Sequence, residues 1–281
     1  MRFVSFYDPH DTVRPGTIQG DRVRVIDLPS LRDYIALEPQ QRTKHHTEQT
    51  IALDGLRLAA PVMPARNVFC VGRNYLEHAK EGARASGIEL KLPDVPTFFT
   101  KAPTAIADPG APLRLQADVS SQYDFEAELG VVIGRRCKNV SEDEALDAVF
   151  GYTCVNDVTA RDRQHAHGQW FKGKSLDDTC PIGPWIVSKD EIGDAQNLKI
   201  GIAIDGVQKQ DGSTSQMIFA IPRLIAELSQ GMTLLPGDVI STGTPAGVGF
   251  ARTPPEFLRD GATMKVTIEK IGTLKNTVRI S

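Results

Sequence analysis

Two glutamates are the residues of this chain best suited to chemistry. Glu126 and Glu128 stand two positions apart in the run DFEAELGVVI at 124–133. Side chains alternate between the faces of a strand, so both carboxylates project from one face and Phe125 and Ala127 from the other. Two buried carboxylates side by side need a shared proton or a cation. The alternative is a solvated sheet face on which both glutamates are simply polar.

A third carboxylate extends this pattern. Asp157 stands near the end of the apolar run GYTCVNDVT at 151–159, and strand ends are where sites on sheets tend to be built. Three carboxylates without a Cys or His cluster make an all-oxygen ligand set, which favours Mg²⁺, with Mn²⁺ or Ca²⁺ possible, over Zn²⁺. We predict a site for Mg²⁺ (or Mn²⁺) with coordination positions left for a chelating substrate.

Other ionisable side chains have two interpretations each. His78 and Glu81 are three residues apart and share one face of a helix, as a surface ion pair or as a working pair. Arg73 could bind a substrate carboxylate or pair with an acid. Lys174 lies between two small residues, where a lysine is usually just solvated.

The glycine-rich run GTPAGVG at 243–249 invites comparison with phosphate-binding loops. It lacks the GK[ST] ending of such loops, and Pro245 removes one amide donor. We therefore reject nucleotide binding and expect the loop to present backbone N–H groups to a carboxylate. His165 and His167 are two residues apart and would not share a helix face, so we expect surface or lid contacts rather than metal ligation.

The elements that must position these residues are mostly strands. Two helices are indicated, one over Glu142–Val149 behind a Ser141 cap and one over Ile221–Leu228 with Pro222 in its first turn. This strand-rich order does not alternate as a doubly wound sheet does, and we predict an α+β fold with a large mixed sheet. The expected strands are Asn67–Gly72, Val95–Lys101, Glu126–Ile133, Ala148–Val155, Leu198–Ile204, Asp238–Thr242 and Met264–Ile268.

The segment 1–60 is expected to form a small β-rich unit. Phe3–Phe6, Thr17–Gln19 and Val23–Ile26 are short apolar runs separated by proline and glycine, which indicates strands. The polar run 40–50 is interpreted as surface helix or loop. A proline-bounded stretch at 61–64 marks the boundary, so we predict a small N-terminal domain at 1–64 and a larger domain at 65–281.

Composition excludes several classes of protein. The 281 residues include 32 basic and 35 acidic side chains, a net charge of −3, which argues against a nucleic-acid binder. No apolar stretch is long enough to span a membrane. The N-terminus shows no signal-peptide core, and the four cysteines form no paired motif. We therefore expect a cytoplasmic protein with reduced thiols.

Six motifs, in order, give the chain a recognisable family resemblance. Over residues 67–281 it resembles the fumarylacetoacetate hydrolase family, whose members place a small N-terminal domain before a mixed β-roll catalytic domain. The resemblance rests on VGRNYLEHAKE at 71–81, FFTKAPTAI at 98–106, DFEAELGVVIG at 124–134, GYTCVNDVTARDRQ at 151–164, WFKGKSLDDTCPIGP at 170–184 and LLPGDVISTGTPAGVG at 234–249.

The resemblance implies roles for individual residues. Metal binding falls to Glu126, Glu128 and Asp157, and a catalytic dyad on a short helix to His78 and Glu81. Larger hydrolases of the family use a fourth carboxylate before the catalytic histidine, but this chain has GRNY there, so a three-carboxylate site is implied. Lys174 is implied to be catalytic, and the residues implied to contact substrate are Arg73, Tyr75, Lys101, Arg161, Gln164 and Thr244. A homodimer is the family's common assembly.

These parts suggest a hydrolase that breaks a C–C bond. Our leading hypothesis is metal-dependent cleavage of acylpyruvate-like 2,4-dioxo acids, such as fumarylpyruvate or maleylpyruvate, with release of pyruvate. His78, oriented by Glu81, would take a proton from water, and Lys174 would stabilise developing negative charge. The alternatives are an oxaloacetate decarboxylase, a 2-hydroxy-diene-dioate isomerase or tautomerase, a ureidoglycolate-type lyase and a catalytically silent binder of 2-oxo acids. The segment Lys80–Pro96 is predicted to be a mobile lid.

Overall fold

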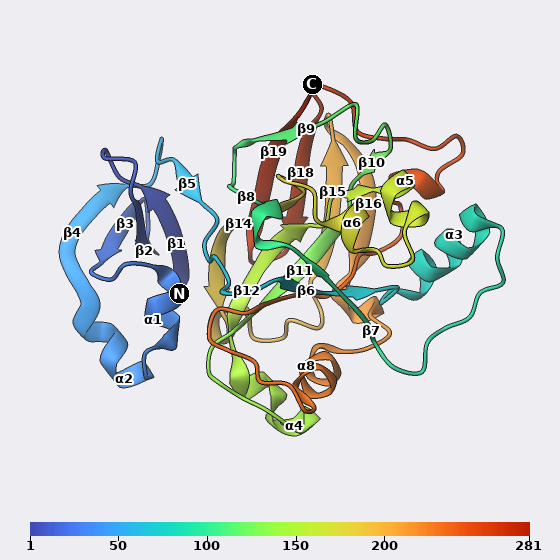
Figure 1. The fold of residues 1–281 in the computed structure, drawn as a ribbon. Coiled ribbons are helices and arrows are strands. Elements are labelled where there is room, and N and C mark those ends of the chain that lie inside the picture. The colour runs from blue at the N-terminus through green and yellow to red at the C-terminus, as the bar shows by residue number, and fades with distance from the viewer.

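A 12-stranded mixed sheet runs through the molecule (Figure 1). In the computed structural model, which describes residues 1–281, the main path of this sheet is β4-β3-β2-β1-β14-β12-β11-β17-β6-β7, with β5 beside β1 and β8 beside β14. The pairs β17–β6 and β14–β8 are parallel and the others antiparallel. The strands are β1 Arg2–Tyr7, β2 Val13–Gln19, β3 Arg22–Ile26, β4 His46–Ala52, β5 Leu58–Ala59, β6 Val68–Gly72, β7 Thr97–Lys101, β8 Ile106–Ala107, β11 Ala127–Ile133, β12 Val149–Asn156, β14 Cys180–Ser188 and β17 Val239–Ser241. The predicted α+β fold with a large mixed sheet is confirmed.

The central strands of this sheet are buried on both faces. Every residue of β11 and β12 is buried, as their nearly continuous apolar sequences require. Gly130 allows the two strands to lie close together, because a Cβ there would fall 2.8 Å from the Val155 side chain. Glu128 lies within β11 and is 1% exposed. A solvated sheet face is therefore excluded as the explanation of this glutamate.

A second sheet covers the central strands. Its five strands follow the order β16-β15-β18-β19-β9, and its apolar side chains share one core of 39 buried residues with those of β11 and β12. Burial alternates along β18, as expected where one face of a strand packs on a core. The strands are β9 Pro112–Leu115, β15 Lys199–Ile204, β16 Val207–Ser213, β18 Thr263–Ile268 and β19 Gly272–Ile280; a separate short pair joins β10 Tyr123–Asp124 and β13 Thr159–Ala160.

The N-terminal residues form the antiparallel strands β1 to β4 at one end of the large sheet (Figure 1, blue). The three strands predicted in this region lie within β1, β2 and β3 and are confirmed. The prediction of helix or loop for the polar run 40–50 is wrong in part, because β4 begins at His46. A polar sequence suits β4, since it is a largely exposed edge strand paired on one side only. The domain boundary between residues 64 and 65 stays a prediction.

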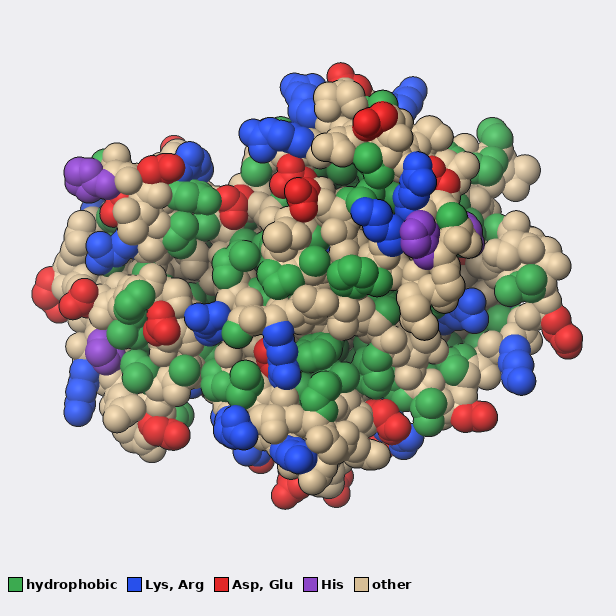
Figure 2. Space-filling model, viewed as in Figure 1, with side chains coloured by type: hydrophobic (Ala, Val, Ile, Leu, Met, Phe, Trp, Pro, Cys, Tyr) green, Lys and Arg blue, Asp and Glu red, His purple; other side chains and the backbone are tan.

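Helices are few and short. The predicted helix at 221–228 is confirmed as α8, Ile221–Ser229. The helix predicted over 142–149 behind the Ser141 cap is shorter, because α4 ends at Ala145 and a 3₁₀ turn follows it. None of the helices combines the length and the apolar character of a membrane span. All four cysteines are free and buried. Figure 2 shows acidic and basic side chains interspersed over the visible face. The helices are α1 Leu31–Ala36, α2 Pro39–Arg42, α3 Leu76–Ser86, α4 Glu142–Ala145, α5 Arg161–Ala166, α6 Phe171–Lys174, α7 Lys189–Ile192 and α8 Ile221–Ser229, and the 3₁₀ turns are η1 Thr43–His45, η2 Pro103–Ala105, η3 Leu146–Ala148, η4 Thr214–Gln216 and η5 Gly249–Ala251.

Candidate metal centre and active site

The three carboxylates predicted to bind metal lie together. Glu126, Glu128 and Asp157 offer oxygen atoms that all lie within 4.8 Å of one another. The pairing of β11 with β12 brings them together, because the Asp157 amide donates to the Glu126 carbonyl oxygen at 2.9 Å. None of the three is more than 4% exposed. Their oxygens form the compact all-oxygen donor set that hard divalent cations prefer.

Two buried lysines neutralise part of this charge. Lys174 Nζ donates to Glu126 Oε2 and to Asp157 Oδ2, each at 2.7 Å. Lys101 Nζ donates to the other oxygen of Asp157, also at 2.7 Å, and to the Val158 carbonyl oxygen. Burial would lower the pKa of Lys174, but the Asp157 and Glu126 carboxylates outweigh burial and raise that pKa. Both lysines therefore act as buried cations of the cluster.

An arginine ties Glu126 to a fourth carboxylate. Arg161, at the start of α5, donates to Glu126 Oε1 at 2.6 Å, to Asp124 Oδ2 at 2.8 Å and to Gln164 Oε1 at 3.1 Å. Burial would raise the pKa of Glu126, but the adjacent Lys174 and Arg161 outweigh burial and lower it. Glu126 is therefore held as a carboxylate with a fixed orientation.

Glu128 has no cation of its own. Its Oε2 accepts from the Ser241 hydroxyl at 2.5 Å and from the Gly243 amide at 3.0 Å. Burial, reinforced by the charges of Asp157 and Glu126, raises the pKa of Glu128 to about 8.

The local charge balance tests whether a cation fits here. Four buried carboxylates, those of Asp124, Glu126, Glu128 and Asp157, face only three buried cations, Lys101, Arg161 and Lys174. With all four ionised, the cluster would carry one uncompensated negative charge, which either a proton on Glu128 or a bound cation can remove. A divalent cation would remove this excess of negative charge, so the donor set fits Mg²⁺ or Mn²⁺.

The predicted dyad is formed on helix α3. His78 Nδ1 and Glu81 Oε1 lie 2.9 Å apart, and both side chains are largely buried. The amide of Gly247 donates to both oxygens of Glu81, at 2.9 and 3.0 Å, and so fixes the carboxylate from the other side. A histidine that donates from Nδ1 to a carboxylate has Nε2 free to accept a proton.

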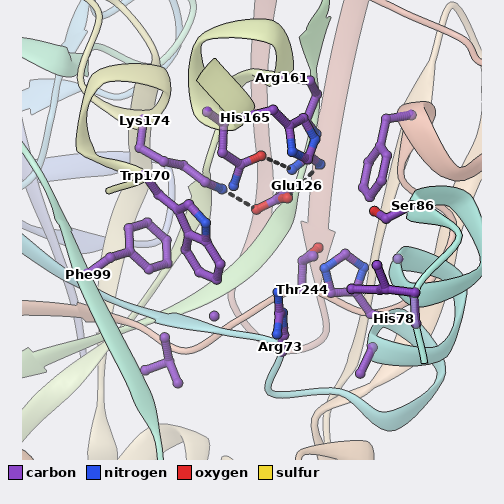
Figure 3. Close-up of a pocket in the computed structure, with 18 of the residues that line it drawn as sticks. Arg73, His78, Ser86, Phe99, Glu126, Arg161, His165, Trp170, Lys174 and Thr244 are labelled. Atoms are coloured by element: carbon purple, nitrogen blue, oxygen red, sulfur yellow. Dashed lines mark hydrogen bonds and ion pairs between the residues drawn. The ribbon is translucent and has the colours of Figure 1, made fainter. Parts of the chain in front are cut away.

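One pocket joins the carboxylate cluster to this histidine. It has a volume of about 360 Å³, and it is drawn in Figure 3, where Lys174 and Arg161 both reach Glu126. His78 and Glu128 also line it. Of the predicted substrate contacts, the pocket is lined by Arg73, Arg161, Gln164 and Thr244.

Two predicted substrate contacts lie outside the pocket lining. Lys101 is fully buried behind Asp157, and its ammonium group is already bonded to that carboxylate and to a carbonyl oxygen. Tyr75 is 1% exposed, and its hydroxyl has no hydrogen-bond partner. The strand and the helix start that carry these residues turn their side chains into the interior, and their contact with substrate stays a prediction.

Several lining residues were not predicted. Phe99, Trp170 and Phe250 supply aromatic walls, and His165 reaches the pocket edge-on to Phe250, with ring centroids 6.3 Å apart. That position agrees with the expectation of a surface or lid contact for His165. The aromatic residues stand inside the quoted motifs or next to them, but no spacing rule marks them, because their place depends on packing between distant segments.

The predicted lid has two parts in the structure. Its first residues belong to α3, which ends at Ser86, and residues 88–96 are without helix until β7 begins at Thr97. Ser86 and residues 88–91 line the pocket. The segment therefore borders the pocket, while its mobility stays a prediction.

Comparison with known proteins agrees with this site. Residues 67–279 match the family model described as "Fumarylacetoacetate (FAA) hydrolase C-terminal". The chain belongs to the fumarylacetoacetate hydrolase family. It is similar to "Oxaloacetate tautomerase YisK" of Bacillus subtilis, with 48% identity over 81% of this chain and 74% of the relative. It is also similar to "Oxaloacetate tautomerase fahd2, mitochondrial" of Xenopus laevis, with 36% identity over 99% of this chain and 90% of that one.

A solved structure extends the similarity to the whole fold. The crystal structure named 2-hydroxyhepta-2,4-diene-1,7-dioate isomerase from Mycobacterium marinum aligns with a TM-score of 0.82 and 38% identity, covering 100% of this chain and 99% of the other. Named relatives of this family member are thus enzymes that act on small molecules.

Proposed function

We propose that this family member is a metal-dependent keto–enol tautomerase of oxaloacetate-type 2-oxo dicarboxylic acids. The observation that carries the proposal is the single pocket that joins a cation-binding carboxylate cluster to a histidine with a free Nε2. Tautomerisation needs these two features, an electrophile at the carbonyl oxygen and a base at the neighbouring carbon. The names of two similar proteins favour this reaction among the chemistries that such a site permits.

The residues of the site have separate roles in this reaction. Glu126, Glu128 and Asp157 would hold Mg²⁺ or Mn²⁺, and the bound cation would supply Lewis-acid polarisation of the 2-oxo group. His78 Nε2 takes the proton from C3 as Glu81 holds the ring in place. The protonated Nε2 of His78 then gives this proton to the C2 oxygen, which completes the enol, and the reverse sequence restores the keto form.

Lys174 contributes charge at the cluster. Its ammonium group lies 2.7 Å from oxygens of both Glu126 and Asp157, and Lys174 lines the pocket. A fixed positive charge there stabilises negative charge that develops on a bound substrate oxygen.

Hydrolysis of an acylpyruvate is the second candidate. It is favoured by the size of the pocket, about 360 Å³ with residues 88–91 in its lining, which gives space for a longer acyl tail. His78 would then take its proton from a water molecule, and hydroxide would attack the distant carbonyl. Isomerisation of a diene-dioate, the activity in the name of one structural relative, would move a proton through the same groups.

The proposal is tested by following the enol absorbance of oxaloacetate with Mg²⁺ or Mn²⁺, and with EDTA as a control. Pyruvate released from oxaloacetate and from fumarylpyruvate is measured in parallel, so decarboxylation and hydrolysis are scored separately. Tautomerisation that the protein accelerates over the rate with the same metal and no protein supports the proposal. Metal-dependent pyruvate release from fumarylpyruvate without tautomerisation would replace it with the hydrolase.

Two variants test the assigned roles. His78→Ala is expected to slow tautomerisation by about 10²- to 10⁴-fold and to keep Mg²⁺ binding. Glu126→Ala is expected to lose both. A Glu126→Ala protein that titrates with Mg²⁺ like wild type would contradict the ligand assignment.

Three further predictions belong with this proposal. The metal in use is predicted to be Mg²⁺ or Mn²⁺, the assembly a homodimer and the location the cytoplasm. Metal analysis of the purified protein and sedimentation in solution test the first two.

A further inference from the structure

Arg73 is an unpaired cation at the pocket. Two buried cations of the lining, Arg161 and Lys174, are held by carboxylates, whereas Arg73 is exposed there and has neither an ion pair nor a hydrogen bond from its side chain. Its backbone has a φ of 57°. This left-handed conformation is uncommon for arginine. Such outliers gather at functional sites, where the surrounding structure maintains them.

Trp170 supports the guanidinium group of Arg73. The Arg73 guanidinium carbon lies 5.6 Å from the centre of the Trp170 ring. This separation is within the range of a cation–π contact. Figure 3 shows both residues among the lining side chains, on different segments of the chain.

The Trp170 ring is itself fixed in place. It packs on the backbone of Gly72, where a Cβ would fall 2.3 Å from Trp170 Cζ3. On another side it meets Phe99 edge-on, with ring centroids 5.4 Å apart at 73°. Glycine at position 72 is therefore required for this ring position, and the ring then determines where the adjacent Arg73 can lie.

We propose that Trp170 is a positioning residue that holds Arg73 ready to bind the second carboxylate of a 2-oxo dicarboxylic acid. The inference rests on the proposed function, in which the first carboxylate and the 2-oxo group lie at the cluster. Arginine binds carboxylates through two parallel, charge-assisted hydrogen bonds, and it stacks on aromatic rings more readily than lysine does. Trp170 and Arg73 thereby select substrates with an anionic tail.

Two exposed charged residues of the segment 88–96 also line this pocket. Lys91 also lacks a partner, but it is exposed on the segment 88–96 and has no aromatic support. Glu89 on that segment would repel an anionic tail. Because only Arg73 is held by a packed ring, Lys91 is the matched control for Arg73.

The test compares oxaloacetate with its 4-methyl ester, which keeps the C3 protons, lacks the second negative charge and adds one methyl group. Wild type is expected to prefer oxaloacetate in kcat/KM. Arg73→Gln is expected to lower kcat/KM for oxaloacetate by about 10- to 100-fold and for the ester far less. Lys91→Gln is expected to lower kcat/KM for oxaloacetate by less than about threefold, since an exposed charge without a fixed position is screened.

Variants of Trp170 separate positioning from a structural role. Trp170→Leu is expected to lose about 3- to 10-fold of the preference for oxaloacetate, chiefly through KM. Trp170→Phe keeps an aromatic ring and is expected to retain most of the preference for oxaloacetate. Gly72→Ala, which displaces the ring without removing it, is expected to behave like Trp170→Leu. Equal losses for acid and ester in Arg73→Gln or Trp170→Leu would overturn the inference.

Binding distinguishes failure of this inference from failure of the proposed function. If wild type does not turn over oxaloacetate, the proposed function fails, and the inference is judged by calorimetry with Mg²⁺. There 2-oxoglutarate is expected to bind more tightly than 2-oxopentanoate, which has the same carbon chain without the second carboxylate, and Arg73→Gln is expected to abolish the difference. Equal affinities in wild type, or no binding of either acid, would refute the role of Arg73.

Discussion

At the scale of single residues, Glu128 differs from the other ligands of the predicted metal site. Glu126 and Asp157 each accept hydrogen bonds from a buried lysine, whereas Glu128 accepts only from a hydroxyl and an amide. Burial, with the charges of Asp157 and Glu126, raises its pKa from the usual 4.5 to about 8. In the metal-free protein Glu128 therefore keeps a proton at neutral pH, which a cation must displace.

This proton makes stability depend on pH. Between about 4.5 and 8 the unfolded chain has lost the Glu128 proton and the folded chain keeps it, so this group lowers the free energy of unfolding as pH rises. Glu128→Gln cannot titrate, and in EDTA it is expected to gain stability relative to wild type across that interval. Urea unfolding at several pH values measures the difference. A difference that is constant from pH 5 to 8 would contradict the argument, and so would a Mg²⁺ affinity of wild type that does not rise with pH.

Lys101 supports the carboxylate cluster without lining the pocket. The Lys101 ammonium group bonds to Asp157 and does not line the pocket. Lys101→Met therefore leaves the fully buried Asp157 carboxylate with less positive charge beside it. We expect a loss of roughly 3 kcal/mol in the free energy of unfolding without metal, and a smaller loss with Mg²⁺ bound. Lys80→Met removes an exposed ion pair with Glu77. This control is expected to cost less than about 1 kcal/mol. Equal effects of the two changes in urea titrations would refute this role.

Sequence reasoning predicted residues whose relation is local. The alternation of Glu126 and Glu128 and the three-residue spacing of His78 and Glu81 follow from strand and helix periodicity alone. The pairing of Lys101 with Asp157 joins residues 56 positions apart. Such contacts depend on the register of the sheet, which local periodicity does not determine.

At the scale of elements, one loop connects helix α3 to the carboxylate cluster. The consecutive amides of residues 247–250 donate to two carboxylates, Gly247 and Val248 to Glu81 on α3, and Gly249 and Phe250 to Asp124. Asp124 in turn pairs with Arg161, which pairs with Glu126. The position of α3 is thereby coupled to the position of a predicted metal ligand.

Glu81 is therefore expected to affect both the rate of tautomerisation and the stability of helix α3. Glu81→Ala removes the acceptor for the loop amides, so hydrogen exchange of the α3 backbone should become faster as well as tautomerisation slower. His78→Ala keeps the Glu81 bonds to the loop and should lose activity with exchange unchanged. If both variants leave α3 exchange at the wild-type rate, the loop does not anchor the helix.

Strands were predictable from sequence when they are apolar. The expected strands at 67–72 and 198–204 correspond to β6 and β15, because a buried strand needs an apolar sequence. Strand β14 lies at the centre of the sheet and was missed, since its sequence CPIGPWIVS contains two prolines, which argue against a central strand. Edge strands such as β16 were missed because polar residues suffice where one side stays exposed.

At the scale of the whole molecule, the N-terminal strands and the rest of the chain share one apolar core. A cluster of 16 buried residues contains Phe3, Tyr34 and Ile35 together with Phe150 and Ile186 from the far side of the predicted boundary. The Phe3 ring lies 4.7 Å from that of Phe150 and 5.5 Å from that of Tyr34. Strand β1 also pairs with β14, so the large sheet is continuous across the boundary.

This shared core predicts a single unfolding transition. Phe3→Ala is expected to lower the free energy of unfolding by about 3–5 kcal/mol. The midpoint of unfolding should fall for residues 65–281 as well as for the N-terminal strands. Trp185 packs against the apolar cluster of the N-terminal strands, so the measurement uses a Trp185→Phe background. The fluorescence of the remaining Trp170, which lines the pocket, then follows the larger part, whereas circular dichroism follows the whole chain. The control is Val207→Ala, at a residue that is 57% exposed. Its free energy of unfolding should stay within about 0.5 kcal/mol of wild type. A Phe3→Ala protein with an unchanged fluorescence midpoint and an early circular-dichroism transition would mean that the N-terminal domain unfolds independently, because its contacts would then contribute nothing to the stability of the catalytic sheet.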